Sequence, residues 1–389
     1  MLYVTKDRTL FLSFFLLVWL LLGWITVQAE PVPTPPQVPV RGYLLVDYQS
    51  DKVLAEMKSD ERMDPASITK LMTGYIVYKA LKAGKIALKD PVTISEKAWR
   101  MSGSKMFVKL GTQVSVEDLL MGMVVQSGND ATVALAEYVA GSEDTFVQLM
   151  NQEAERLGMK NSHFTNASGL PNAKHYMSAR DIVALTRALI RDFPEHYPRY
   201  GVRSFKYNNI EQPNRNQLLL TDPSVDGVKT GHTDSAGYCL VSSAKRNDMR
   251  LISVVLGAKK EKERFQASET LLNYGFSLYE SRKLHDAHTP VLTTRIWKGQ
   301  EKELALGVAQ PLYVTVPKGQ APQVSTLTRV QPTIIAPAHK DQPFGEIVVK
   351  LGDQEVSRTP LVALQDVPAS GWFGRLIDAI LLFFHSLFN

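Results

Sequence analysis

Strand-type segments lie at both ends of a long helical stretch, and this arrangement restricts the possible fold more than any other feature. Residues 43–47 and 52–56 read as a β-hairpin, and residues 238–244 and 250–258 read as two further strands. The apolar spacing between these two pairs is helical. Because strand backbones must find hydrogen-bond partners, we expect the N- and C-terminal strands to meet in one sheet.

The helical stretch divides into separate segments with recognisable starts. The first helix is expected to begin at Ser67, with Leu71 and Tyr75 on its apolar face. Ser115 and Asp118 are spaced like a capping box. The remaining expected helices cover residues 115–126, 130–140, 143–158, 178–192 and 263–279.

The N-terminal 29 residues read as an export signal. Lys6 and Arg8 supply positive charge, residues 10–25 are apolar, and Ala29 ends a short run suited to cleavage. The apolar run is long for a signal peptide, so an uncleaved membrane anchor is the competing interpretation. We expect cleavage after Ala29, and under both interpretations the rest of the chain is exported. The proline-rich residues 30–40 then form an extended lead-in.

Composition restricts the possible partners. The net charge of +5 comes without a dense run of Lys and Arg interleaved with aromatic residues, which argues against nucleic-acid binding. A mildly basic protein is suited to anionic lipid or an acidic cell-wall polymer. Cys239 is the only cysteine, so no internal disulfide can form and stability must come from packing. We interpret Cys239 as a buried core residue.

The 389 residues exceed a single typical core, and the sequence changes character near its last third. We expect a first domain at 41–281 and a small all-β domain at 290–366, where short β-type runs alternate with Pro and Gly. Residues 371–389 form a separate tail. Wound as a helix, the tail gathers its polar residues, including Arg375 and Asp378, on one narrow face. A membrane-spanning helix would bury both charges, so we expect an in-plane membrane anchor, with packing on the second domain as the alternative.

Three short motifs carry the chemistry. Ser67 and Lys70 form Ser-x-x-Lys, residues 127–129 form Ser-x-Asn between two expected helices, and residues 229–231 form Lys-Thr-Gly on an expected edge strand. Singly, each motif has an ordinary structural explanation, such as a helix cap, a solvated lysine or an interhelical turn. Together and in this order, they are the motif set of penicillin-recognising serine enzymes.

The first motif has a clear chemical reason. A serine hydroxyl needs a base within hydrogen-bond reach, and residues at i and i+3 of a helix are neighbours. Lys70 can act as that base if burial or a nearby cation such as Lys229 lowers its pKa. Ser-x-x-Lys also occurs at 102–105, in a turn-like segment, and at 242–245, on a strand that turns the two side chains to opposite sides.

From about Val40 to the final helix, the chain resembles the low-molecular-mass penicillin-binding proteins that act as D-alanyl-D-alanine carboxypeptidases. The similarity rests on "ASITKLMT", "QSGNDA", "SARD", "NRN" and "VDGVKTGHTDSAGY". It implies an α+β fold: a β-lactamase/transpeptidase-like catalytic domain with helices on both sides of an antiparallel sheet, then a small all-β domain and a C-terminal amphipathic helix. It implies removal of the terminal D-alanine from peptidoglycan pentapeptides, inhibition by β-lactams, and a peripheral position on the periplasmic face of the inner membrane.

The resemblance also implies the catalytic roles. Ser67 would be the acyl-enzyme nucleophile and Lys70 its proton acceptor. Ser127 would relay a proton between Lys229 and the leaving group. The backbone amides of Ser67 and His232 would form the oxyanion hole.

Substrate contacts follow from the same resemblance. Asn129 would bind the peptide amide of the substrate, and Thr230 with Arg264 would hold its terminal carboxylate. Gly231 belongs to the same substrate-binding strand, and Arg215 in "NRN" would support the site. No metal or cofactor is implied, since the eight histidines lack ligand spacing.

Three alternatives stay open. A class A-like β-lactamase is disfavoured because no "E-x-x-L-N" segment lies between Ser127 and Lys229. A D,D-endopeptidase would use the same residues, and an inert wall-binding protein would need none of them. One departure from the family pattern is Ser168, where several relatives carry His, and we expect it to affect deacylation or substrate preference rather than to abolish activity.

Overall fold

The computed structural model describes residues 33–388, with side chains as far as His385. The expected export signal and the first residues of the lead-in lie outside the described residues. Five strands form the central sheet, in the order β2 (Val53–Met57), β1 (Gly42–Asp47), β9 (Met249–Ala258), β8 (Gly237–Arg246) and β7 (Val225–Thr233). All neighbouring pairs are antiparallel, and β7 is an edge strand. The prediction that distant strands meet in one sheet is confirmed.

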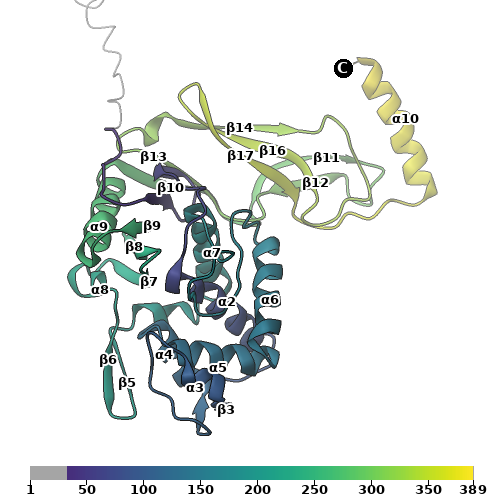
Figure 1. The fold of residues 1–389 in the computed structure, drawn as a ribbon. Helices are drawn as coiled ribbons and strands as arrows, with labels where there is room; N and C mark the ends of the chain where they lie inside the picture. The colour runs from purple at the N-terminus through teal and green to yellow at the C-terminus, as the bar shows by residue number, and fades with distance from the viewer. Residues whose placement is uncertain (1–32, 389) are drawn as a thin grey trace, which may run out of the picture. The chain divides into compact units, whose positions relative to one another are not determined.

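Helices lie on both sides of this sheet (Figure 1), and its two faces enter separate hydrophobic cores. On β1, Leu44 and Val46 join the core that contains the long helices, whereas Tyr43 and Leu45 join the core beneath α9 (Glu261–Leu278). This alternation follows from the two-residue period of a strand. Helices therefore cover both faces of the sheet.

The helices expected from periodicity all form. Those between the strand pairs are α2 (Lys70–Lys82), α4 (Val116–Val124), α5 (Asn129–Ala140), α6 (Glu143–Arg156) and α7 (Ala179–Asp192). Two short helices, α3 (Glu96–Arg100) and α8 (Leu218–Thr221), were not expected. Ser115 caps α4 by accepting a hydrogen bond from the Asp118 amide, as its spacing predicts. Two small hairpins, β3–β4 (Pro91–Thr93 and Gln113–Ser115) and β5–β6 (Ser204–Tyr207 and Ile210–Pro213), complete this part.

One helix start differs from the prediction. Ser67 does not lie in an α-helix: it lies in a 3-10 turn, η1 (Ala66–Thr69), and the α-helix begins at Lys70. The turn follows Ala66, whose φ is +47°, and the Ile68 amide donates to the Pro65 carbonyl in the i+3 pattern of a 3-10 turn. Side chains three residues apart eclipse in such a turn, so Ser67 still lies directly over Lys70.

The C-terminal part of the chain is built from strands. Its strands are β10 (Tyr279–His285), β11 (Pro290–Trp297), β12 (Glu303–Gly307), β13 (Leu312–Pro317), β14 (Val324–Val330), β15 (Ile334–Ile335), β16 (Pro343–Leu351) and β17 (Gln354–Ala363). Six of them form one sheet, and β10 pairs with β13. The domain limits 41–281 and 290–366 stay predictions.

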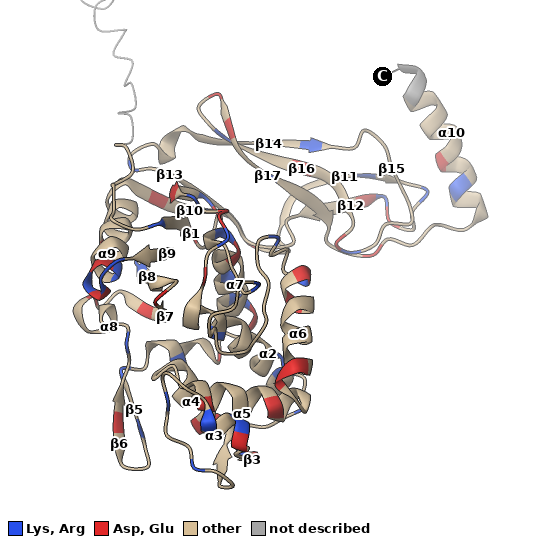
Figure 2. Cartoon of the chain, viewed as in Figure 1, with Lys and Arg blue, Asp and Glu red and all other residues tan. Residues whose placement is uncertain are grey.

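The last helix, α10 (Trp372–Phe388), contacts this β part through the Asp378 carboxylate and through the ring of His385, which meets the Trp297 ring with centroids 5.5 Å apart. Asp378 is 1% exposed; it accepts a hydrogen bond from the Lys298 amide at 2.6 Å and pairs with the Lys302 amine at 3.0 Å. Apart from Asp378 and Arg375 the helix carries no Asp, Glu, Lys or Arg (Figure 2). Its large apolar side chains, among them Phe373 and Phe383, are exposed. Among residues 33–388, no helix is both long and apolar enough to cross a membrane.

Candidate active site

A cleft of about 480 Å³ lies between the edge strand β7 and the helical part of the catalytic domain. Eight of the ten residues expected at the site line it: Ser67, Ser127, Asn129, Arg215, Thr230, Gly231, His232 and Arg264. The other two, Lys70 and Lys229, are 1% and 3% exposed and lie outside the lining. The structure thus brings the three distant motifs together.

The amine of Lys70 joins three segments of the chain. Its Nζ lies 2.8 Å from Ser67 Oγ, 2.7 Å from Asn129 Oδ1 and 2.7 Å from the carbonyl oxygen of Ser168. These partners come from η1, from the start of α5 and from a loop nearly one hundred residues further along. The buried Lys70 nitrogen therefore connects Ser67 to two other segments that border the cleft.

Burial decides the protonation of this amine. Burial, followed by the positive charge of Arg215, lowers the pKa of Lys70 from 10.5 to about 7. The sequence suggested Lys229 as the neighbouring cation, and the structure gives that role to Arg215. The pKa of Lys229 also lies well below its ordinary value. Burial is the largest cause, and the charge of Lys70 is the second. Both amines therefore lose their proton at a lower pH than an exposed lysine does.

Ser127 has the position for a proton relay but no fixed partner. It lies between α4 and α5 with φ at +64°, an uncommon conformation for a residue with a side chain. Its Oγ is buried and has no hydrogen-bond partner among residues 33–388, whereas the Lys229 amine donates to the Thr230 carbonyl at 3.1 Å. Because a buried hydroxyl without a partner is costly, this oxygen is ready to bond a ligand.

The strand β7 approaches the nucleophile closely at Gly231. A Cβ at this position would lie 2.8 Å from the Pro65 carbonyl oxygen and 3.2 Å from the Cβ of Ala66. Only glycine lets the strand pack so near the turn that carries Ser67. The next residue, His232, stacks on Tyr238 with ring centroids 4.0 Å apart, which supports a positional role for its side chain.

The opposite wall of the cleft is the loop at 166–170. Gly169 has φ of +84°, and a Cβ there would lie 1.8 Å from the Ala66 carbonyl oxygen. Ser168 contributes its backbone carbonyl to Lys70, while its hydroxyl lies 3.3 Å from Asn166 Oδ1. The departure from the family pattern at Ser168 therefore leaves the backbone contact with Lys70 in place.

A further wall, the loop at 102–108, was missed at the sequence level. Gly103 and Ser104 line the cleft, and the Ser102 carbonyl accepts a hydrogen bond from Asn129 Nδ2 at 2.7 Å. Asp130 holds this loop, because its carboxylate accepts bonds from three successive backbone amides, those of Met106, Phe107 and Val108. The only sequence signal for this loop was Asp130, the aspartate directly after Ser-x-Asn.

Two arginines give the cleft its charge. Asn214 and Asn216 of "NRN" bond to the Val202 and Gly227 carbonyls, which leaves Arg215 between them on the cleft wall. Arg264 is 3% exposed, and it donates to the Gly231 carbonyl at 3.3 Å and to Glu261 at 2.6 Å. Glu261 also lines the cleft and was not singled out from the sequence.

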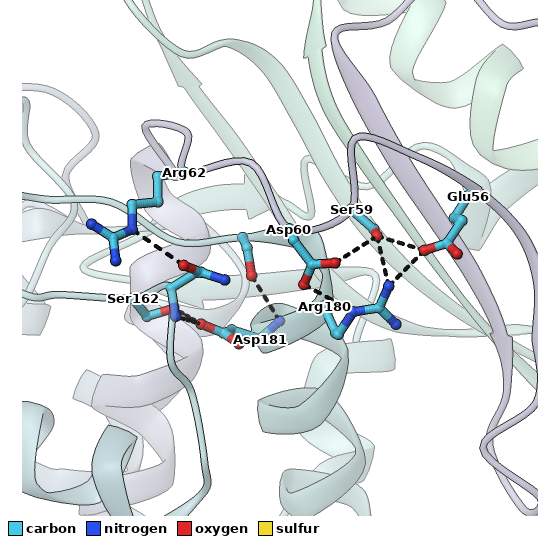
Figure 3. A network of polar contacts seen from close by, with 9 residues as sticks. Glu56, Ser59, Asp60, Arg62, Ser162, Arg180 and Asp181 are labelled. Carbon is cyan, nitrogen blue, oxygen red and sulfur yellow. Dashed lines mark hydrogen bonds and ion pairs between the residues drawn. The ribbon is translucent and has the colours of Figure 1, made fainter.

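The segment that precedes the nucleophile is fixed from behind by the "SARD" residues (Figure 3). Arg180 pairs with Glu56 at 2.6 Å and with Asp60 at 2.9 Å, and it donates to Ser59. Asp181 accepts hydrogen bonds from the Asn161 amide and from the Ser162 hydroxyl. These contacts tie the chain before η1 to the start of α7, which explains the motif as structural support.

The fold, with a serine that contacts a buried lysine amine at the cleft, is that of a penicillin-recognising serine peptidase. A family model described as D-alanyl-D-alanine carboxypeptidase matches residues 29–260, and one described as penicillin-binding protein 5, C-terminal domain, matches residues 279–369. The chain belongs to the D-alanyl-D-alanine carboxypeptidase family, as the sequence resemblance predicted.

Individual relatives agree with this assignment. The chain is 44% identical to D-alanyl-D-alanine carboxypeptidase DacC of Escherichia coli, over 93% of this chain and 92% of that protein. The crystal structure of penicillin binding protein 5 from Haemophilus influenzae matches with a TM-score of 0.82 and 42% identity, covering 86% of this chain and 99% of that one. Penicillin-binding protein D2 from Listeria monocytogenes, in its ampicillin-bound form, matches with a TM-score of 0.58 and 28% identity over 63% of this chain and all of that one.

The contact of Gly169 with the turn of Ser67 can be tested with a matched pair of alanine variants. Gly158 has a similar φ of +73° but no atom within 4 Å of a Cβ, so Gly158→Ala should cost only the strain of a left-handed residue, about 1 kcal/mol of unfolding free energy. Gly169→Ala adds a clash with the Ala66 carbonyl and should cost at least about 2 kcal/mol. It should also slow acylation by labelled penicillin. Equal losses in denaturant unfolding, with equal acylation rates, would contradict this role for Gly169.

Proposed function

We propose that the enzyme removes the C-terminal D-alanine of peptidoglycan stem peptides through an acyl-enzyme on Ser67. The observation that supports this most is the 2.8 Å contact between Lys70 Nζ and Ser67 Oγ inside a buried site. With a pKa of about 7, the amine is substantially neutral at neutral pH. A neutral amine can donate its two hydrogens to Asn129 and to the Ser168 carbonyl, which turns its lone pair toward Ser67.

Acylation then begins with attack by Ser67 and ends with departure of D-alanine. The Ser67 oxygen attacks the carbonyl carbon of the penultimate D-alanine while its proton passes to Lys70. The backbone amides of Ser67 and His232 would stabilise the oxyanion. The bond from carbon to nitrogen breaks as Ser127 gives its proton to the departing amine of D-alanine. Ser127 regains a proton through the lysine amines, so that the proton taken up by Lys70 leaves with the product. Water hydrolyses the ester and restores Ser67.

Substrate recognition uses the cationic side of the cleft. Thr230 and the largely buried Arg264 are suited to the terminal carboxylate. Asn129 has both ends of its amide engaged, with Lys70 and with the Ser102 carbonyl. Each end has further capacity, because the oxygen can accept a second bond and the nitrogen carries a second hydrogen. It can therefore bind a peptide group without releasing Lys70.

The location of the enzyme is part of the same proposal. The N-terminal 29 residues would direct export, and α10 would lie on the membrane surface, so that the protein is peripheral on the periplasmic face. The contacts of α10 through its polar residues Asp378 and His385, together with the exposure of most of its large apolar side chains, support this. The limits 41–281 and 290–366 are our proposal for the two globular domains.

The central test is release of D-alanine. The purified chain without residues 1–29 and 371–389 should release free D-alanine from a peptide ending in D-Ala-D-Ala and should be acylated by labelled penicillin. Ser67→Ala should abolish both, whereas Ser102→Ala, at the rejected motif match, should retain acylation. Absence of D-alanine release from the intact enzyme would refute the proposal. A penicillin adduct lasting seconds would favour a β-lactamase, and cleavage of cross-linked peptides alone would favour an endopeptidase.

The pH profile tests the role of Lys70. Because the neutral amine is the reactive form, the acylation rate should rise about tenfold per pH unit and level off above about pH 7. Arg215 lowers the pKa of Lys70, so Arg215→Gln should raise that pKa and move the rising limb to higher pH. Arg203→Gln removes the same charge from an exposed position outside the cleft and should leave the midpoint unchanged. A profile that Arg215→Gln does not move, or moves to lower pH, would exclude this electrostatic contribution.

Vesicle binding tests the proposed anchor. The chain without residues 1–29 should sediment with vesicles of anionic phospholipid. Lysine at both Ile377 and Phe384, which are 57% and 53% exposed, should reduce binding to background. Leu220→Lys changes an apolar residue that is 66% exposed elsewhere on the chain and should have no effect. Equal binding by all three proteins would place the membrane contact outside α10.

A further inference from the structure

The guanidinium of Arg264 already holds a carboxylate in this structure. Its Nη2 donates to Glu261 Oε1 at 2.6 Å, one turn earlier on α9. The arginine side chain is 3% exposed, whereas that of Glu261 is 55% exposed and lines the same cleft. The pair therefore joins a fixed, buried cation to a solvated anion at the rim of the cleft.

The remaining hydrogen-bonding capacity of Arg264 is limited. Its Nη1 donates to the Gly231 carbonyl at 3.3 Å, and its buried Nε has no partner among the described residues. A guanidinium binds a carboxylate best through two parallel N–H groups. A ligand carboxylate that enters beside Thr230 must therefore share Arg264 with Glu261, or displace it.

We propose that Glu261 is a specificity-determining residue that competes with the ligand carboxylate for Arg264. The proposal rests on the function given above, because it assumes that Arg264 receives the terminal carboxylate. Glu261 weakens the binding of every ligand with a free carboxylate, both by occupying Nη2 and by placing a like charge at the rim. Ligands without that carboxylate do not experience the competition.

This competition also affects the end of the reaction. The released D-alanine keeps its carboxylate, so it can remain on Arg264 after the bond to the acyl group has broken. Return of the Glu261 side chain to Nη2 restores the pair seen in the structure and favours departure of the product. The same residue thus raises the KM for acidic substrates and lowers inhibition by free D-alanine.

The test compares two ligands in three proteins. The ligands are an acyl-D-Ala-D-Ala peptide as the free acid and as its C-terminal carboxamide, each measured as a competitor of acylation by fluorescent penicillin. The proteins are the enzyme without residues 1–29, Glu261→Gln and Glu269→Gln. Glu269 is exposed on the same helix and lies outside the cleft lining, so its substitution removes an equal charge without touching Arg264.

Glu261→Gln should raise the preference for the acid over the amide by about two- to fivefold, the range expected when one largely solvated ion pair is removed. The KM for the acid should fall with kcat little changed, free D-alanine should inhibit more strongly, and Glu269→Gln should match the unmodified enzyme. An unchanged preference would overturn the proposal. A reduced preference with a raised KM would also overturn it, because Glu261 would then serve to position Arg264. The competition assay measures binding and needs no turnover. If the enzyme released no D-alanine, the proposed function would fail, but the assay would still test the role of Glu261.

Discussion

The structure of the site depends on keeping one lysine amine away from water. Lys70 is almost fully buried, and its pKa falls from 10.5 to about 7, which corresponds to a cost on the order of 5 kcal/mol for the charged form. Three oxygens from three segments surround the nitrogen, so opening any one wall would rehydrate it. The same contacts that assemble the cleft therefore lower the pKa of the amine, as the proposed role of Lys70 as a base requires.

This constraint explains why backbone contacts are so close around Ser67. Gly231 on one side and Gly169 on the other leave no room for a side chain against the turn Ala66–Thr69. Their packing excludes water from behind the nucleophile, while the front remains open as the cleft. The cations Arg215 and Arg264 add to the burial by favouring neutral amines at Lys70 and Lys229, and they also suit an anionic ligand.

Much of this arrangement could be read from the sequence because it depends on short, ordered motifs and on periodicity. The edge strand of Lys229, the junction that holds Ser127 and the pairing of Ser67 with Lys70 all follow from local pattern. The 3-10 form of the Ser67 turn did not, because contacts from distant loops decide it. The Ser168 carbonyl was missed for a related reason: any residue can supply a backbone oxygen, so nothing in the side-chain pattern indicates it.

Charged residues near the site were harder still to interpret. Arg264 and Glu261 have the i, i+3 spacing of many solvated helix pairs. The family resemblance placed Arg264 at the site, but only the fold shows that it is buried and that Glu261 lines the same cleft. The tail shows the opposite situation. Its wide apolar face was readable from the sequence, but the contact of Asp378 with Lys298 and Lys302 depends on a loop some 80 residues earlier.

Asp130 has a mechanical consequence for how ligands enter. Its carboxylate accepts bonds from the amides of Met106, Phe107 and Val108, and also from that of Ala131 in its own helix. Asp130 thereby joins the loop at 102–108 to α5, the helix that carries Asn129, and the two must move together. The loop at 102–108 cannot move away from the cleft by itself while Asn129 stays bonded to Lys70. A ligand that enters the cleft therefore meets a wall of fixed shape on this side, with Asn129 already held in position.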